Sequence, residues 1–180
     1  MPQIYELLKN DHDKTRELLE DLVSLDAEDI EARDEIIQDI RDDLIPHARA
    51  EEAVFYNSLR SLTDETETVM HGFKEHAEAE TILRTLQLID KVGADWKGLA
   101  EKLQEAVEHH IEEEEDQIFA LGRKVLSDEE ATAIGSAFER MKPEVREEGF
   151  MKNTADLIGN LLPPRVKTAL GGKPPEVTRR

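Results

Sequence analysis

Several features are scarce or missing in this sequence, and each absence removes a class of function. None of the 180 residues is cysteine, which excludes disulfide frameworks, thiolate metal sites and thiol catalysis. Aromatic residues make up only 4% of the chain. No run of uncharged apolar residues approaches the roughly 18 residues that a membrane span needs. The first residues contain no basic region ahead of an apolar one, so we predict no secretory signal and a cytoplasmic protein without membrane contact.

Positive charge is scarce over most of the chain. Residues 1–150 hold 40 acidic and 17 basic side chains, a net charge of −23, whereas residues 151–180 carry +4. An acidic surface repels phosphate backbones, so the sequence predicts no binding to nucleic acid. Carboxylates in this number can attract cations, although most of them are expected simply to keep a helical protein soluble.

Helix-forming residues are abundant, and the apolar ones among them recur with helical spacing throughout. The connections between the periodic segments are short, so neighbouring helices should run antiparallel. The sequence therefore predicts an all-α fold, an antiparallel up-down-up-down four-helix bundle followed by a short fifth helix. The expected bundle helices cover about residues 2–25, 28–61, 64–91 and 95–122.

Proline and glycine set several of the predicted boundaries. Pro46 lies inside the second helix and predicts a kink or break there, and Gly122 is expected to end the fourth helix. The fifth helix is expected over residues 128–141, with Pro143 ending it. The predicted division of the chain is a bundle over residues 1–125, an accessory helix over 126–150 and a basic tail containing proline and glycine over 151–180.

The six histidines carry most of the functional information, because five of them have a glutamate four residues later. Side chains at i and i+4 project from one helix face, so such a pair can reach one ion or two adjacent ions. At about 100° per residue, three of these pairs share a face with the apolar residues of their helix and point into the core. The inward pairs are His47/Glu51, His76/Glu80 and His110/Glu114.

The other two pairs point elsewhere. His71 lies about 140° from His76, and His109 about 100° from His110, toward solvent or a helix flank. The sixth histidine, His12, lies about 80° from the centre of the apolar stripe of the first helix. We include it among the candidate ligands because of the three inward pairs.

Four imidazoles and three carboxylates in a leucine-rich interior need compensation, because each unpaired ionised carboxylate costs several kcal/mol in desolvation. A network of hydrogen-bonded histidine–glutamate pairs could offset part of that cost. Metal is the better account, since two divalent ions carry four positive charges against three carboxylates. Imidazole and carboxylate ligands suit iron, manganese or zinc, and facing helices are where such sites form.

The ordered set of His12 and the three inward pairs resembles the hemerythrin, or HHE cation-binding, family over about residues 4–122. The resemblance implies a four-helix bundle around two iron ions joined by an oxo or hydroxo bridge. It also implies that one iron has fewer protein ligands and is the natural place for oxygen, peroxide or nitric oxide. The implied ligands are His12 and His47 on that iron, His76, Glu80 and His110 on the other, and Glu51 and Glu114 as bridges.

One departure from the family pattern bears on function. Oxygen-carrying hemerythrins place a histidine where this chain has Glu80, and an anionic ligand favours ferric iron. We therefore expect a di-iron protein that reacts with or senses oxygen or peroxide, with peroxide disproportionation as the most concrete enzymatic form and no catalytic residue beyond the metal ligands. The alternatives are a non-enzymatic protein that binds iron, oxygen or nitric oxide and signals to a partner through residues 123–180, and a metal-free helical interaction module.

Overall fold

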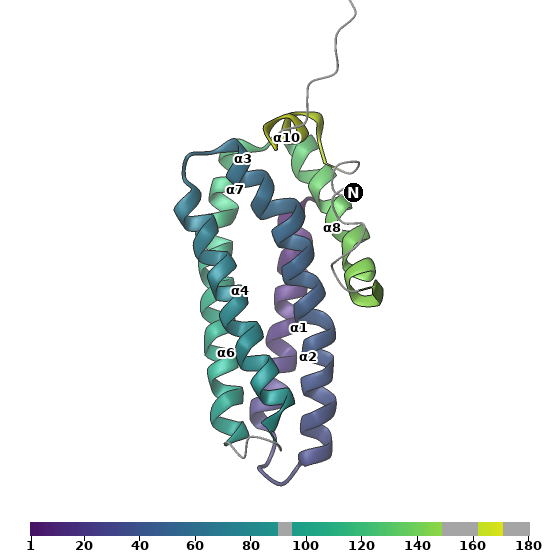
Figure 1. Cartoon of the computed structure of the whole chain (residues 1–180), viewed down its shortest axis with the longest axis vertical. Coiled ribbons are helices and arrows are strands. Elements are labelled where there is room, and N and C mark those ends of the chain that lie inside the picture. The colour runs from purple at the N-terminus through teal and green to yellow at the C-terminus, as the bar shows by residue number, and fades with distance from the viewer. Residues whose placement is uncertain (90–94, 149–161, 171–180) are drawn as a thin grey trace, which may run out of the picture.

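The predicted all-α bundle is confirmed by the computed structural model, which describes residues 1–89, 95–148 and 162–170 and contains no strand within them (Figure 1). Four long helices run side by side and enclose the core. They are α1 (Ile4–Ser24), α2 (Ile30–Glu51), α4 (Thr66–Gln87) and α6 (Trp96–Glu113). Among the described helices, none combines the length and the hydropathy needed to cross a membrane.

Further helices extend the bundle at one end and along one side. They are α3 (Asn57–Leu62), α7 (Phe119–Val125), α8 (Asp128–Glu148) and α10 (Pro164–Ala169). The helix α8 packs against α1 and α2, and α10 packs against α3. Of the predicted tail, only residues 162–170 are described, and Leu162 and Val166 are buried in the core. The rest of residues 151–180 lies outside the described residues.

Two π-helical turns interrupt the bundle helices, and neither lies at Pro46, where the sequence predicted a kink or break. The predicted break is wrong, because α2 continues as α-helix through Pro46, where packing of the neighbouring Leu44 in the core outweighs the lost backbone hydrogen bond. A kink at Pro46 stays a prediction. The chain departs from α-helix farther on, at the π-helical turn Glu52–Tyr56 that leads into α3. A second π-helical turn, Glu114–Ile118, joins α6 to α7. Such turns are frequent at functional sites.

Two predicted helix ends are also wrong. Gly122 lies inside α7, where an added Cβ would come within 2.8 Å of the Tyr5 hydroxyl and 3.1 Å of the Phe55 ring. The glycine therefore allows close packing and does not act as a stop signal. Pro143 lies inside α8 and is exposed, so water can satisfy the backbone carbonyl that proline leaves without a donor.

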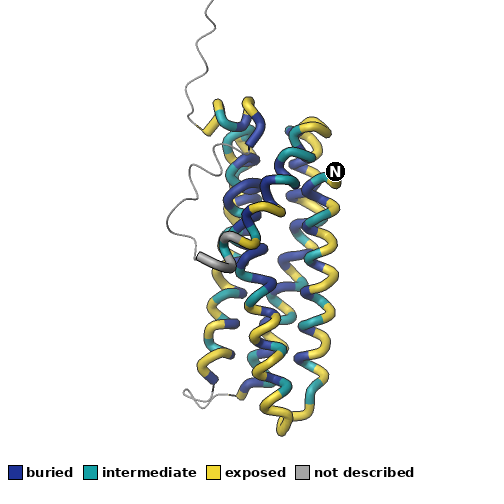
Figure 2. Tube along the Cα trace, turned by 90° about the vertical axis from the view of Figure 1, so that its right-hand side faces the viewer, coloured by how far each residue is buried: buried dark blue, intermediate teal, exposed yellow. Residues whose placement is uncertain are grey.

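Two apolar clusters fill the bundle and leave a polar layer between them. One cluster, toward α3 and α7, includes Leu8 and Val69. The other, toward the opposite end, includes Leu19, Leu83 and Leu103. Figure 2 shows the buried residues following the inner faces of the long helices across both clusters. Histidines and glutamates are buried in the layer between the two clusters.

Candidate metal centre

Six of the seven predicted ligands meet in the polar layer of the bundle. Each is at least 94% buried, although each carries a polar or charged head group. The long helices α1, α2, α4 and α6 each contribute one imidazole, and the two carboxylates come from the points where the π-helical turns begin. The six are His12, His47, Glu51, His76, His110 and Glu114.

These side chains form two adjoining groups, each able to hold one ion. One group is His12, His47 and Glu114, and the other is Glu51, His76 and His110; in each, one ligand atom per residue lies within 4.8 Å of the others. Glu114 Oε2 is 3.1 Å from His12 Nε2 and 3.7 Å from His110 Nε2. Glu51 Oε2 is 3.5 Å from His47 Nε2 and 3.4 Å from His76 Nε2. Each carboxylate thus faces histidines of both groups, which is the position of a bridging ligand.

Every one of the four imidazoles is oriented by a further carboxylate. These partners were not assigned from the sequence, and each lies 3.0 or 3.1 Å from a ring Nδ1. Because a carboxylate accepts, each Nδ1 carries the hydrogen and each Nε2 presents a lone pair to the centre. The pairs are Asp11 with His47, Glu52 with His76, Glu75 with His110 and Glu115 with His12.

The π-helical turns explain how two consecutive glutamates serve one centre. Glu51 reaches the centre directly, whereas Glu52 accepts from His76 on the neighbouring helix. Glu114 and Glu115 divide the same two tasks around His12. The two glutamate doublets of the sequence were the available signal for these supporting residues.

The fifth helix also supports the site. Lys142 of α8 donates a hydrogen bond to the Asp11 carboxylate that orients His47. The Phe138 ring of α8 meets the His47 ring edge-on, with 5.7 Å between the centroids. On the opposite side of the centre the Tyr56 ring stacks on His76. These contacts restrict the rotation of the imidazoles.

The polar layer lacks internal compensation for its lone pairs and charges. The Nε2 atoms of His76 and His110 lie 2.9 Å apart, and since both Nδ1 atoms donate elsewhere, two lone pairs face each other and repel unless a cation lies between them. Within the described part of the chain, both oxygens of Glu51 and of Glu114 lack a hydrogen-bond partner. His12 Nε2 is 3.1 Å from Glu114 Oε2 but does not form a hydrogen bond of good geometry. Buried polar atoms are rarely left in this state, so the residues fit a pair of cations.

The electrostatics of the layer favour cation binding as well. Burial, and then the charge of Glu114, raise the pKa of Glu51 well above its usual range. Burial also acts to raise the pKa of Glu114, but the nearby His12 and His110 imidazoles outweigh it and lower that pKa. Burial, together with His110, lowers the pKa of His76 to about 4. His76 is therefore neutral at neutral pH, the form that binds metal.

Glu80, the seventh predicted ligand, is directed elsewhere in the structure. Its carboxylate accepts hydrogen bonds from Arg49 and Arg84, and it is in neither of the two buried groups found among the described residues. It does line a void of about 20 Å³ together with His76 and His110. The role of Glu80 as an iron ligand stays a prediction.

A comparison with known protein families shows which family the chain belongs to. The model of the hemerythrin HHE cation binding domain matches residues 3–121. The chain belongs to this hemerythrin HHE family. A solved HHE cation-binding domain-containing protein from Mycobacterium kansasii has a TM-score of 0.68, with 20% identity, over 88% of this chain and 98% of that one. At this identity the likeness shows the fold alone.

A curated relative of this HHE domain has a longer chain. A Nostoc protein named DNA nickase is 28% identical over 144 residues, which are 80% of this chain and 40% of that protein. The chain thus spans less than half the length of this relative. The histidine and glutamate clusters of the structure agree with the cation-binding character of the HHE family.

Proposed function

We propose that this HHE domain is a non-haem di-iron protein that reacts with or senses oxygen or peroxide. The observation that carries this proposal is the distance of 2.9 Å between the Nε2 atoms of His76 and His110. Beside them lie four buried carboxylate oxygens, for which the described residues offer no hydrogen-bond partner. A donor set of imidazole nitrogens and carboxylate oxygens suits iron. The ligands would be His12 and His47 for one ion, His76 and His110 for the other, and Glu51 and Glu114 between them.

The protein's own residues would hold and orient this centre. The carboxylates of Asp11, Glu52, Glu75 and Glu115 keep the imidazole hydrogens on Nδ1 and the lone pairs on Nε2. The apolar clusters on either side exclude water from the layer. When bound, two irons that change oxidation state together supply the two electrons exchanged in peroxide disproportionation.

The space beside the centre supports a small ligand. The void of about 20 Å³ next to His76 and His110 holds about one water-sized molecule, which fits oxygen, peroxide or nitric oxide and excludes larger substrates. It is lined mainly by aliphatic residues such as Leu44 and Val107. The family resemblance points to the His12 and His47 iron for ligand binding, whereas this void lies beside the other pair.

Metal analysis of freshly purified protein, with its ultraviolet-visible spectrum, tests the proposal. We expect two irons per chain and absorption from oxo-to-iron charge transfer. His47→Ala and His110→Ala should each lose iron, because each removes a ligand, whereas His71→Ala changes an exposed histidine and should retain it. Full iron retention in both buried variants would contradict the assignment.

Oxygen evolution separates the enzymatic form from the sensing form. Sustained release of oxygen from added peroxide indicates disproportionation, whereas a single spectral change without oxygen release indicates a binding or sensing protein. For the sensing form we propose a cytoplasmic protein that signals to a partner through residues 123–180. We do not propose a nickase activity, because a net charge of −19 opposes binding to a phosphate backbone.

A further inference from the structure

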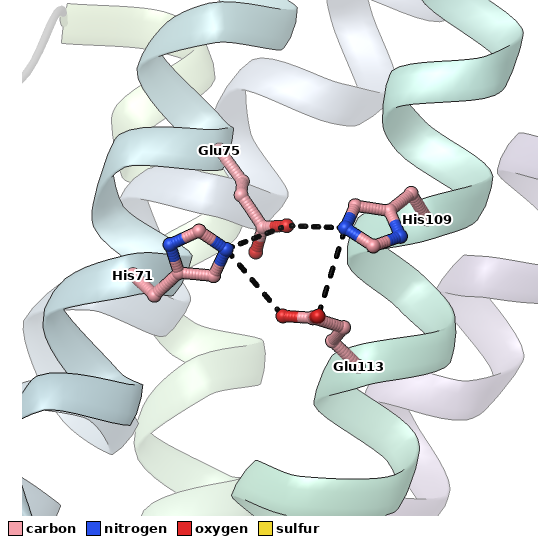
Figure 3. Close-up of side chains that lie close together, drawn as sticks. All are labelled: His71, Glu75, His109 and Glu113. Carbon is pink, nitrogen blue, oxygen red and sulfur yellow. Dashed lines mark ion pairs between the residues drawn. The ribbon is translucent and has the colours of Figure 1, made fainter.

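A second histidine–glutamate cluster lies on the outer face of the bundle. The pairs expected to point away from the core do so, and they point toward each other. His71 and Glu75 of α4 face His109 and Glu113 of α6, as Figure 3 shows. The histidine side chains are 53% and 60% exposed. The proposed di-iron function uses neither histidine.

The four head groups alternate around one central point. His71 Nε2 lies 3.6 Å from Glu75 Oε1 and 3.5 Å from Glu113 Oε2. His109 Nε2 lies 3.7 Å from Glu75 Oε1 and 3.6 Å from Glu113 Oε1. In a tetrahedral zinc site with bonds of 2.0–2.2 Å, neighbouring ligand atoms lie about 3.3–3.6 Å apart. The cluster therefore already has nearly the dimensions of a metal site.

Glu75 supplies an independent indication of a cation. Its side chain is only 10% exposed, and its Oε1 is buried, faces both outer histidines and has no hydrogen-bond partner among the described residues. Its other oxygen, Oε2, accepts from Nδ1 of His110 at 3.1 Å. A buried carboxylate oxygen without a donor is unfavourable, and a cation at the centre of the cluster would remove this deficit.

We propose that His71, Glu75, His109 and Glu113 bind a single divalent transition-metal ion, separate from the central pair. Two imidazoles with two carboxylates form a ligand set that suits zinc. Calcium and magnesium are disfavoured because they require oxygen ligands. A groove of about 720 Å³ beside His109 is lined by six glutamates and a single lysine, and this negative lining raises the local concentration of cations.

Glu75 connects the outer ion to the centre. With Oε1 on the outer ion and Oε2 on the His110 imidazole, one carboxylate would fix the orientation of a central ligand. Outer zinc should therefore alter the iron absorption spectrum without changing the iron content. This connection, unlike the outer site itself, rests on the proposed di-iron centre.

The test counts zinc and iron separately in the full chain. Protein purified with its central metal is equilibrated with zinc and desalted, and both metals are measured by mass spectrometry. We expect wild type to hold one zinc more than His71→Ala or Glu113→Ala. Glu20→Ala removes an exposed carboxylate of α1 that lies outside both the cluster and the groove, so it serves as the control and should bind zinc like wild type. Circular dichroism melts verify that all variants fold.

The outcomes separate the two sites. Equal zinc in wild type, His71→Ala and Glu113→Ala would overturn the outer site, as would an equal loss in Glu20→Ala. If zinc replaces iron in the centre, all variants should release a similar amount of iron. The difference in zinc content between wild type and variant then still reports the outer site. If this difference is present but no preparation contains iron, the outer site stands and the di-iron proposal fails.

Discussion

Glu51→Met should have opposite effects on the stability of the metal-free and the metal-loaded protein. Glu51 is fully buried, and neither of its oxygens has a hydrogen-bond partner in the described part of the chain. The carboxylate therefore destabilises the folded state of the metal-free protein, and methionine fills similar space without a charge. Replacing a buried unsatisfied group with an apolar one of similar shape should raise the free energy of unfolding by about 1–3 kcal/mol.

This gain corresponds to a rise in melting temperature of about 2–12 °C for a chain of this size. The metal-loaded protein should show the reverse, because the variant loses a bridging ligand and with it the stabilisation that metal binding adds. The gain should also depend on pH. Because the pKa of Glu51 is raised, the metal-free wild type loses stability as pH rises above the ordinary carboxyl range, and the variant lacks this loss.

Thermal melts with and without chelator, at several pH values, measure both effects. Glu80→Met is the matched control, because its carboxylate is paired with Arg49 and Arg84 and its removal should leave the metal-free protein equally or slightly less stable. A metal-free Glu51→Met protein that is less stable than wild type would refute the reasoning. So would a Glu51→Met protein that keeps both irons and the full metal-dependent rise in melting temperature.

Three further predictions follow from individual contacts. If Glu80 leaves its two arginines to bind iron, Glu80→Ala should lower the iron content, and two irons per chain in that variant would show that it is not a ligand. Gly72→Ala would place a Cβ 2.7 Å from the Tyr56 hydroxyl, so it should lower the free energy of unfolding by about 1–3 kcal/mol. Denaturant titrations measure this change. Gly98→Ala is the control and should be nearly neutral, because its Cβ meets only the Asp95 carboxylate, which can move. Incubation with supercoiled plasmid and magnesium, without oxygen, should produce no nicked circles, since the chain carries a net charge of −19.

The boundary predictions that failed share one physical cause. Pro46, Gly122 and Pro143 were read by their local backbone preferences, which favour helix interruption. In the bundle, the packing of neighbouring side chains or the exposure of the affected carbonyl decides the conformation. The backbone preference of one residue contributes little to helix stability when the apolar face of the helix already packs against other helices.

Helical periodicity by itself determined the bundle and the inward direction of three histidines, because the spacing of side chains on one helix is a local property. Sorting His47, His76 and His110 from His71 and His109 required nothing beyond that spacing, and burial follows it. What only the tertiary structure decided depends on the register and rotation of one helix against another. The hydrogen bonds by which Glu52 and Glu115 orient histidines of other helices depend on this register. So does the outer cluster between α4 and α6. Such contacts join residues distant in the sequence, and helical spacing contains no information about them.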